Sequence, residues 1–406
     1  KVPILPQVKL DNRRLKILTI SDDVDFKKDV RLELKVSEYG DFRPITLDWY
    51  PKVQVYRKAK GSNQSMAQDS NICILGDDHT AFADWDQIYF ELQEFKNERS
   101  WYNLSNEKSK LTEIISNSWW YDLYIPEDET RVDSFSKVRL WNEIIVSLLK
   151  AYAERYYNRY KSEYMSKHMK TEWLTPEHPN FEEEYEIQIK ESETRIIENL
   201  SSLVDLLNND KFKNDLNLGP DFEAFNFLRH LYKPLLYIKQ SQLEDKIKIA
   251  PVALVNSEWR FVKDLREYYL NNGDRFEDTT LCLLRNQSRK GVGFFEAHGF
   301  YPDFILWLNK GQRQNIVFID PKGLRQVTGF DHPKIRFYKT IKEEIEHDLD
   351  DSDVSLNSFI VTTTNFPEVK FWDQNQDMKA FNNHHVYFMN EQKDSYIESI
   401  VNEILE

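Results

Sequence analysis

The chain of 406 residues has very few cysteines, since it contains only Cys73 and Cys282. These two lie far apart without metal-ligand spacing, so the sequence offers neither a disulfide framework nor a cysteine metal site. It also lacks an apolar run of membrane-spanning length, a signal peptide and the phosphate-binding motif Gly-x-x-x-x-Gly-Lys-Ser/Thr. We therefore expect an intracellular protein that neither crosses a membrane nor binds ATP.

Positive charge is also scarce. The chain has 54 Lys and Arg against 68 Asp and Glu, which gives a formal net charge of −14. Such a surface repels phosphate, so a nucleic acid would have to be bound by local basic clusters. The hydrophobic content of 40% and aromatic content of 14% predict a folded chain with room for two or three domains. The chain begins at Lys1 and not at a methionine, which suggests a fragment or a processed product.

The pattern of apolar residues predicts an α+β multidomain protein with three consecutive parts. Residues 1–100 contain short alternating segments and are expected to be β-rich. Residues 101–246 are expected to be mainly helical, with amphipathic helices over 185–207 and 222–237 among them. Residues 247–406 give the order helix, three strands, helix, strand, which predicts an α/β core around a central sheet.

An aromatic and basic stretch at residues 155–161 leaves two interpretations open. Tyrosines and arginines in alternation are typical of surfaces that stack on the bases of nucleic acids. Tyrosines along a helix more often pack against a neighbouring part of the protein, and we favour this second interpretation.

Two charged residues end a strongly apolar strand in the last part of the chain. Within residues 315–323, Phe318, Asp320 and Lys322 share one face, because side chains in a strand repeat every two residues. The preceding apolar strand starts directly after Asp303, and a short polar turn joins the two strands. Charges at the ends of buried strands need a partner or a catalytic role, because burying an unpaired charge is costly.

These residue types suit one kind of chemistry. Asp303 and Asp320 would repel each other unless a cation lay between them, and their hard oxygen atoms suit Mg²⁺ or Mn²⁺. Lys322 can orient and polarise a water molecule or stabilise the charge of a phosphate. The three residues together predict metal-assisted hydrolysis of a phosphodiester. For the triplet Asp-Pro-Lys alone, a simple salt bridge between Asp320 and Lys322 would be the better interpretation.

Pro302-Asp303 followed by Asp320-Pro321-Lys322 resembles the motif of the PD-(D/E)XK nuclease superfamily. The longer run from Leu283 to Gly323 is similar to the C-terminal nuclease region of helicase-linked type III restriction subunits, and the resemblance covers roughly the last two-fifths of the chain. It implies a restriction-endonuclease-like core with a central mixed sheet and a DNA endonuclease that uses Mg²⁺, with Mn²⁺ as a substitute. It also implies restriction or another antiviral defence in the prokaryotic cytoplasm. Since the ATP motif is absent, it implies a helicase or translocase outside this chain.

A third carboxylate is expected to complete the site, and two candidates remain. Glu258 lies on a predicted helix over 257–270, where the resemblance places an acidic residue of the metal site, although a glutamate there also stabilises the helix N-terminus. Glu296 precedes Asp303 by seven residues and would reach the same site from the preceding hairpin. The resemblance further implies that the carbonyl oxygen of Pro321 is a metal ligand.

Basic residues near the motif are the best candidates for contacts with DNA phosphates, because an acidic protein has to concentrate its positive charge locally. The glycines of the turn Gly291-Val292-Gly293 allow close approach of the backbone to a phosphate, or serve only a hairpin. The candidates are Arg285, Arg289, Lys290, Lys334 and Arg336.

Two alternatives to a DNA endonuclease stay open at this point. A nuclease fold can be catalytically silent and kept only for docking DNA or a protein partner. RNA is the other alternative, because the chemistry of the motif does not distinguish the two nucleic acids.

Overall fold

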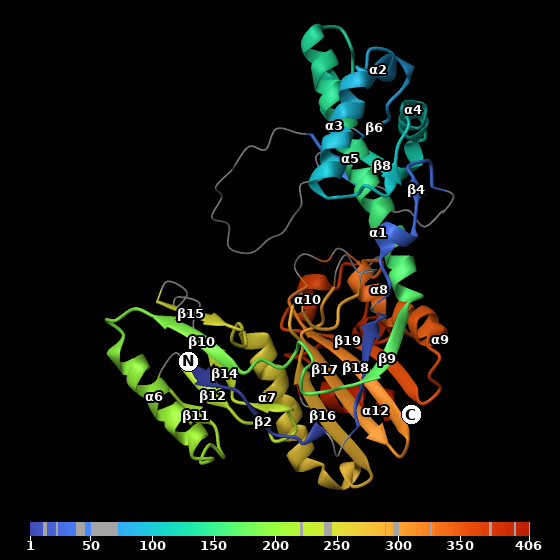
Figure 1. Cartoon of the computed structure of the whole chain (residues 1–406). Coiled ribbons are helices and arrows are strands. Elements are labelled where there is room, and N and C mark those ends of the chain that lie inside the picture. The colour runs from blue at the N-terminus through green and yellow to red at the C-terminus, as the bar shows by residue number, and fades with distance from the viewer. Residues whose placement is uncertain are drawn as a thin grey trace. The chain divides into compact units, whose positions relative to one another are not determined.

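The computed structural model shows a mixed α+β protein with helices and strands in both halves of the chain (Figure 1). Contacts divide it into two compact units, Lys1–Asp22 together with Met165–Glu406, and Asp23–Tyr164. The described residues contain no helix with the length and apolar character that a membrane span requires. The residues that the structure describes are 1–10, 14–21, 23–37, 45–49, 72–219, 222–238, 246–288, 290–294, 300–324, 327, 329–372, 376–393 and 395–405.

The two units differ from the three consecutive domains expected from the sequence. Strand β3 (Lys16–Ile20) pairs antiparallel with β9 (Met169–Trp173), and Ile20 lies opposite Met169. The chain therefore leaves the larger unit after β3 and returns to it at β9. The unit Asp23–Tyr164 is an insertion between two neighbouring strands. Local apolar patterns do not reveal such a pairing, because they carry no information about distant partners.

The inserted unit is organised around one long helix, α5 (Phe135–Ser166). Its tyrosines pack inside the unit: the hydroxyls of Tyr152 and Tyr156 donate hydrogen bonds to the carbonyls of Lys35 (2.8 Å) and Glu33 (2.7 Å). Tyr156 and Tyr157 are buried, which supports packing over base stacking. The other elements of this unit are α1 (Phe26–Asp29), β4 (Leu32–Glu33), β5 (Ile45–Asp48), β6 (Ile72–Cys73), α2 (Asp77–Ala81), α3 (Trp85–Glu98), β7 (Leu104–Ser105), α4 (Lys108–Ser116) and β8 (Tyr121–Tyr124).

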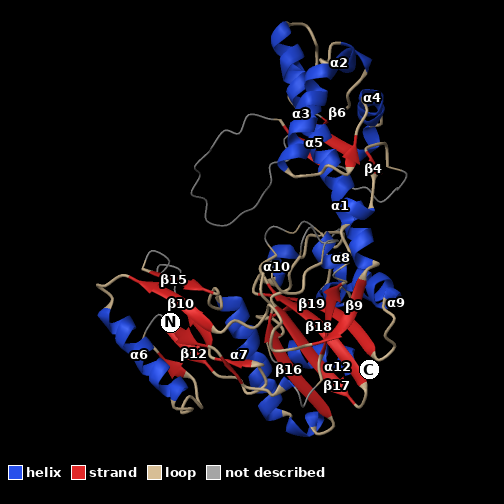
Figure 2. Ribbon diagram, viewed as in Figure 1, coloured by secondary structure: helices blue, strands red, loops and turns tan. Residues whose placement is uncertain are grey.

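Residues 101–246 hold more strands than the expected helical domain allows (Figure 2). The predicted helix over 185–207 begins as strand β10 (Glu184–Ile189) and is helical only as α6 (Thr194–Asn208). The predicted helix over 222–237 is wrong, because antiparallel pairing makes this region into strands. A short apolar run is compatible with a helix or a strand, and pairing with distant strands determines which of the two forms. Further strands of this region are β11 (Leu216–Asn217), β12 (Phe222–Phe225), β13 (Tyr232–Lys233) and β14 (Leu235–Ile238). Strands β1 (Val2–Pro3) and β15 (Ile247–Ala250) pair with β10, and β2 (Leu5–Pro6) pairs with β13.

A five-stranded mixed sheet forms the C-terminal part of the larger unit (Figure 1). Its first three strands are antiparallel, and the last two are added in parallel orientation. The centres of the middle strands, such as 304–308 and 316–319, are apolar and buried, as the sequence predicts for a sheet covered on both faces. The strands in spatial order are β16 (Thr279–Arg285), β17 (Phe304–Lys310), β18 (Arg313–Pro321), β19 (Val354–Thr362) and β20 (Val386–Phe388).

Helices cover both faces of this sheet. Phe261 of α7 (Asn256–Asn271) packs on Phe304, with ring centroids 5.4 Å apart. Phe337 of α8 (Pro333–Thr340) and Phe318 both contact the ring of Phe294. Because Phe304 is paired with Ile319, Phe304 and Phe318 point to opposite faces, so α7 and α8 lie on opposite sides. The remaining helices are α9 (Glu346–Asp348), α10 (Phe366–Val369), α11 (Met378–Asn382) and α12 (Tyr396–Leu405).

The N-terminal segment is bonded directly to this sheet. The backbone N–H of Lys16 donates to Oε1 of Gln314 (2.8 Å), and the Trp307 indole donates to the carbonyl of Lys16 (2.8 Å). Lys16 also forms an ion pair with Asp351 at 2.6 Å. The expected C-terminal domain 247–406 is therefore not self-contained, since it would lose these partners.

We expect the inserted unit to be removable, whereas the C-terminal fragment is not independent. Replacing residues 23–164 by a short Gly-Ser linker should leave a cooperatively folded protein, because the linker closes a hairpin between already paired strands at little entropic cost. The fragment 247–406 should show no cooperative transition. Circular dichroism during heating tests both, and a sharp transition of the fragment alone would contradict this division of the chain.

Candidate active site

The pairing of β17 with β18 brings two carboxylates together at one end of the sheet. Phe304 is opposite Ile319, and continuing this register by one residue places Asp303 opposite Asp320. The Cβ atoms of directly opposed residues in an antiparallel pair are about 4.5–5.5 Å apart. Asp320 shares its face with Phe318, which is the face that α8 covers. The predicted neighbourhood of these two residues is therefore present in the structure.

Asp320 is almost fully buried, with 1% of its surface exposed, and its two oxygen atoms differ in their surroundings. Its Oδ1 lies 3.4 Å from the ammonium nitrogen of Lys322, whose side chain is 47% exposed. Its Oδ2 is buried and accepts no hydrogen bond from a nitrogen or hydroxyl donor, while the carboxyl of Asp303 lies within hydrogen-bonding reach of Asp320. A buried carboxylate oxygen without such a donor is costly, so this atom marks a place where a donor or a cation would be stabilised.

Asp303 is held mainly in its protonated form. Burial, followed by the negative charges of Asp320 and Glu258, raises the pKa of Asp303 from its ordinary value to about 9, while Lys322 acts in the opposite direction. Two carboxylates in a shared buried site cannot both ionise at low cost. At neutral pH the pair therefore binds an extra proton, which a metal ion would have to displace.

Two lysines border the carboxylates. Burial alone would lower the pKa of Lys322, but the charges of Asp320 and Asp303 outweigh it and raise the pKa. Burial and the charge of Lys322 lower the pKa of Lys334, which lies in the first turn of α8 and places its ammonium 5.4 Å above the ring of Phe300. The sequence marked Lys334 only as a phosphate contact; in the structure it also interacts electrostatically with Lys322, Asp320 and Asp303.

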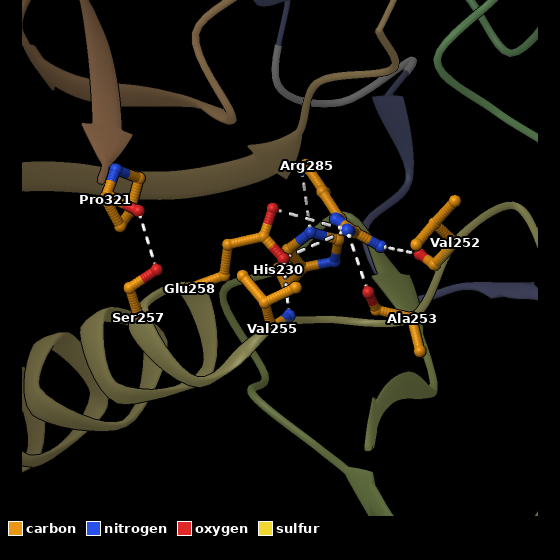
Figure 3. Close-up of polar contacts among 8 residues, drawn as sticks. All are labelled: His230, Val252, Ala253, Val255, Ser257, Glu258, Arg285 and Pro321. Atoms are coloured by element: carbon orange, nitrogen blue, oxygen red, sulfur yellow. Dashed lines mark hydrogen bonds and ion pairs between the residues drawn. The ribbon is translucent and has the colours of Figure 1, made fainter. Parts of the chain in front are cut away.

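Glu258 is not free to bind a metal ion. Its Oε2 accepts hydrogen bonds from the backbone N–H of Val255 (2.8 Å) and from the Arg285 guanidinium (3.0 Å), as Figure 3 shows. The Glu258–Arg285 ion pair is buried, and Arg285 also donates to the carbonyls of Val252 and Ala253. Glu258 thus caps the N-terminus of helix α7, which the sequence offered as the alternative to metal binding. Its charge is compensated by Arg285.

Several polar residues around this pair carried no recognisable signal in the sequence. The Ser257 hydroxyl donates to the carbonyl of Pro321 (2.7 Å), which couples α7 to the end of β18 and occupies one lone pair of the expected ligand (Figure 3). His230 is fully buried, and its Nε2 accepts from the backbone N–H of Arg285 (2.9 Å). Burial lowers the pKa of His230 to about 3, so the ring is neutral.

The basic residues predicted to contact phosphates differ in their exposure and in their partners. Arg285 is buried and ion-paired, so it is not exposed for contact with a phosphate, contrary to expectation. Lys290 is exposed but forms an ion pair with Glu182 (2.7 Å), and Arg336 is exposed on α8. Arg289 and the candidate carboxylate Glu296 lie outside the described residues. Lys334 is thus the predicted phosphate contact that interacts electrostatically with the carboxylates.

A cleft of about 710 Å³ opens next to Asp303 and Glu258. Its lining also includes four glutamates of residues 182–186, of which Glu182 is paired with Lys290. An acidic wall repels phosphate, whereas Lys322 and Lys334 attract it. The charge distribution therefore favours the approach of a phosphate from the side of α8.

The donor atoms of Asp303 and Asp320 suit a divalent cation with few protein ligands. Among the described residues, no group of three or more His, Cys, Asp or Glu side chains is arranged to hold a metal ion. Two carboxylates are opposed at Asp303 and Asp320, and Oδ2 of Asp320 accepts no hydrogen bond from a nitrogen or hydroxyl donor. Mg²⁺ commonly uses only one or two carboxylates and takes its other ligands from water and substrate phosphate. These two residues fit such an ion.

Comparison with known proteins gives no relative. No family model matches the chain, and neither a curated protein nor a solved structure is significantly similar to it. The likeness to PD-(D/E)XK nucleases therefore depends on the motif and on the geometry described above.

We expect the Glu258–Arg285 pair to be a strong determinant of stability. Arg285→Met should destabilise the protein by about 3–5 kcal/mol, because it leaves Glu258 as an unpaired buried charge. Lys290→Met removes an exposed ion pair and should cost less than about 1 kcal/mol. Urea unfolding of both variants measures the difference, and equal small losses would show that the buried pair has no such role.

Proposed function

We propose that this protein is a metal-dependent DNA endonuclease with its active site at Asp303, Asp320 and Lys322. The observation that carries the proposal is the pair of opposed carboxyl groups at the end of a buried sheet. Oδ2 of Asp320 accepts no hydrogen bond from a nitrogen or hydroxyl donor, and a lysine follows two residues further on. The order α7, β16, β17, β18, α8, β19 supports a restriction-endonuclease-like core, because it matches the order that the motif implies.

The chain's own residues have distinct tasks in this proposal. Asp303 and Asp320 bind Mg²⁺ or Mn²⁺, which when bound supplies charge neutralisation at the phosphate and lowers the pKa of a water molecule. Lys322 orients that water by hydrogen bonding, and Lys334 contacts the phosphate from the first turn of α8. Glu258 supports the site through its cap on helix α7 and is not a metal ligand, since Arg285 occupies its carboxylate.

The biological setting is part of the proposal. The resemblance to type III restriction subunits supports a role in restriction or antiviral defence in the prokaryotic cytoplasm. The missing nucleotide-binding motif supports a separate helicase or translocase as the partner that delivers DNA.

Cleavage of plasmid DNA with Mg²⁺ or Mn²⁺ tests the proposal. Asp320→Asn and Lys322→Gln should each lower the cleavage rate by at least about 100-fold, because each removes a group that acts on the transition state. The matched controls are Asp278→Asn and Lys310→Gln, which break an exposed ion pair of 2.9 Å at the other end of the sheet. Controls as inactive as the site variants would contradict the assignment.

The second candidate is a silent nuclease fold that binds DNA or a protein partner. The ion pair between Glu258 and Arg285 favours it, because it removes one acidic residue from the metal site. DNA binding in Ca²⁺ together with no cleavage in Mg²⁺ or Mn²⁺, even with a translocase supplied, would establish this alternative.

Metal binding should depend steeply on pH. Because the pKa of Asp303 is raised to about 9, a proton must leave before the carboxylate can bind the ion. We expect the affinity for Mn²⁺ to rise about tenfold per pH unit between pH 6 and 8, with about one proton released. Calorimetry in two buffers of different ionisation enthalpy measures both quantities. A pH-independent affinity would show that Asp303 is ionised or is not a ligand.

The raised pKa of Asp303 also makes the folding stability of the protein without metal fall as pH rises. A carboxyl group whose pKa is raised on folding stabilises the protein below its ordinary pKa and loses this contribution as pH rises through the folded value. Asp303→Asn should therefore flatten the fall in melting temperature between pH 6 and 9.

Lys334 should contribute to DNA affinity more than other lysines of its helix. In Ca²⁺, Lys334→Gln is expected to weaken DNA binding about tenfold and to reduce the salt dependence by about one counterion. Lys339→Gln, an exposed lysine on the same helix, should change the affinity by less than about twofold. Fluorescence anisotropy at several salt concentrations measures both, and equal effects would place Lys334 outside the site.

A further inference from the structure

Two buried asparagines hold the backbone at the start of β17. The Asn180 side chain is 0% exposed and that of Asn286 is 7% exposed, although asparagine is normally a surface residue. Their amides are bonded to each other, because Nδ2 of Asn180 donates to Oδ1 of Asn286 at 3.0 Å. We call these two residues the amide clasp.

Asn286 is saturated with hydrogen bonds. Its Nδ2 donates to the carbonyls of Val292 (2.7 Å) and Pro302 (2.8 Å), and its Oδ1 accepts from the backbone N–H of Val292 (2.9 Å) and from Asn180. An asparagine amide has two N–H donors and two acceptor sites, so none remains unused. Such a satisfied buried network fixes one geometry.

The bonds of Asn286 converge on the metal-site residue. Its side chain holds the carbonyl of Pro302, and its backbone N–H donates to the carbonyl of Asp303 at 2.8 Å. Two consecutive carbonyls are thus fixed immediately before the first residue of β17. Asn180 adds a further anchor, since its Oδ1 accepts from the backbone N–H of Gln287 at 2.7 Å.

The turn around the clasp is built to make room for it. A Cβ atom on Gly291 would lie 2.1 Å from Oδ1 of Asn286 and 2.3 Å from Oδ1 of Asn180. A Cβ atom on Gly293 would lie 2.3 Å from the ring of Tyr301. The glycines of this turn are therefore required by side chains that pack on them. This finding favours a structural role over the approach to a phosphate that the sequence suggested.

We infer that the amide clasp is a positioning device that sets the orientation of Asp303 toward Asp320 and thereby the affinity of the site for a divalent cation. The inference rests on the proposed function. A carboxyl group at the end of a strand is otherwise fixed on one side only, and once Asp303 loses its proton, as metal binding requires, the repulsion between the two carboxylates favours their separation. The clasp opposes that separation through the backbone, without contacting the metal ion or the substrate.

The test compares two pairs of variants of the full-length protein. Asn286→Leu removes the clasp, and Asn315→Leu is its control. Asn315 is also a buried asparagine that bonds a β17 carbonyl, that of Leu308 at 2.7 Å, but it lies at the far end of the strands. Gly291→Ala displaces the clasp without altering either amide, and Gly273→Ala, which has nothing within 4 Å of the added atom, is its control.

Calorimetric titration with Mn²⁺ is the first readout, and the rate of plasmid cleavage against Mn²⁺ concentration is the second. Asn286→Leu and Gly291→Ala should lower Mn²⁺ affinity about 10–100-fold, as loss of an outer partner of a metal ligand does. Their cleavage rates should recover at high Mn²⁺. Both controls should bind Mn²⁺ within about twofold of the unaltered protein, whatever their melting temperatures.

The outcomes separate this inference from the proposed function. Unchanged Mn²⁺ affinity in a folded Gly291→Ala variant overturns the inference alone, as does an equal loss of affinity in the controls. If Asn286→Leu fails to fold, Gly291→Ala and the milder Asn180→Ala still decide the matter. If the unaltered protein binds no Mn²⁺, the proposed metal site and this inference are both wrong.

Discussion

The antiparallel register of β17 and β18 is the constraint on which the site depends. It places Asp303 opposite Asp320 within a sheet that is covered on both faces. A shift of one residue would turn one carboxylate to the other face, because side chains alternate along a strand. The cost of two neighbouring buried carboxylates is offset by protonation of one of them and by Lys322 on the other.

A further buried charge near Asp303 and Asp320 is compensated by an ion pair. Glu258 brings a third carboxylate near the pair, and Arg285 compensates it within hydrogen-bonding distance. His230, neutral and fully buried, bonds the backbone of Arg285 and so holds β16 in place beneath the ion pair. The surroundings of the site therefore depend on polar contacts from His230 through Arg285 to Glu258, and His230 lies outside the C-terminal part of the sequence.

The sequence predicted that Asp303, Asp320 and Lys322 lie close together because its signal is local. Asp320 lies near the end of β18 with Lys322 two residues later, and Asp303 directly precedes β17, which a short turn joins to β18. The sequence did not predict that Arg285 would occupy Glu258, because these residues are 27 positions apart and meet only through tertiary packing. The Asn180–Asn286 contact spans 106 positions and gives no periodic pattern. The insertion of residues 23–164 was missed for the same reason, since β3 and β9 pair across it.

The most direct measurement is a crystal structure of the protein soaked with Mn²⁺ near pH 8, with anomalous diffraction to locate the ion. The account predicts an anomalous peak bonded to carboxylate oxygens of both Asp303 and Asp320, including the Oδ2 atom of Asp320 that accepts no hydrogen bond from a nitrogen or hydroxyl donor in the metal-free protein. A peak elsewhere, or none beside an Asp320 that remains paired with Lys322, would contradict the assignment of these carboxylates as the metal site.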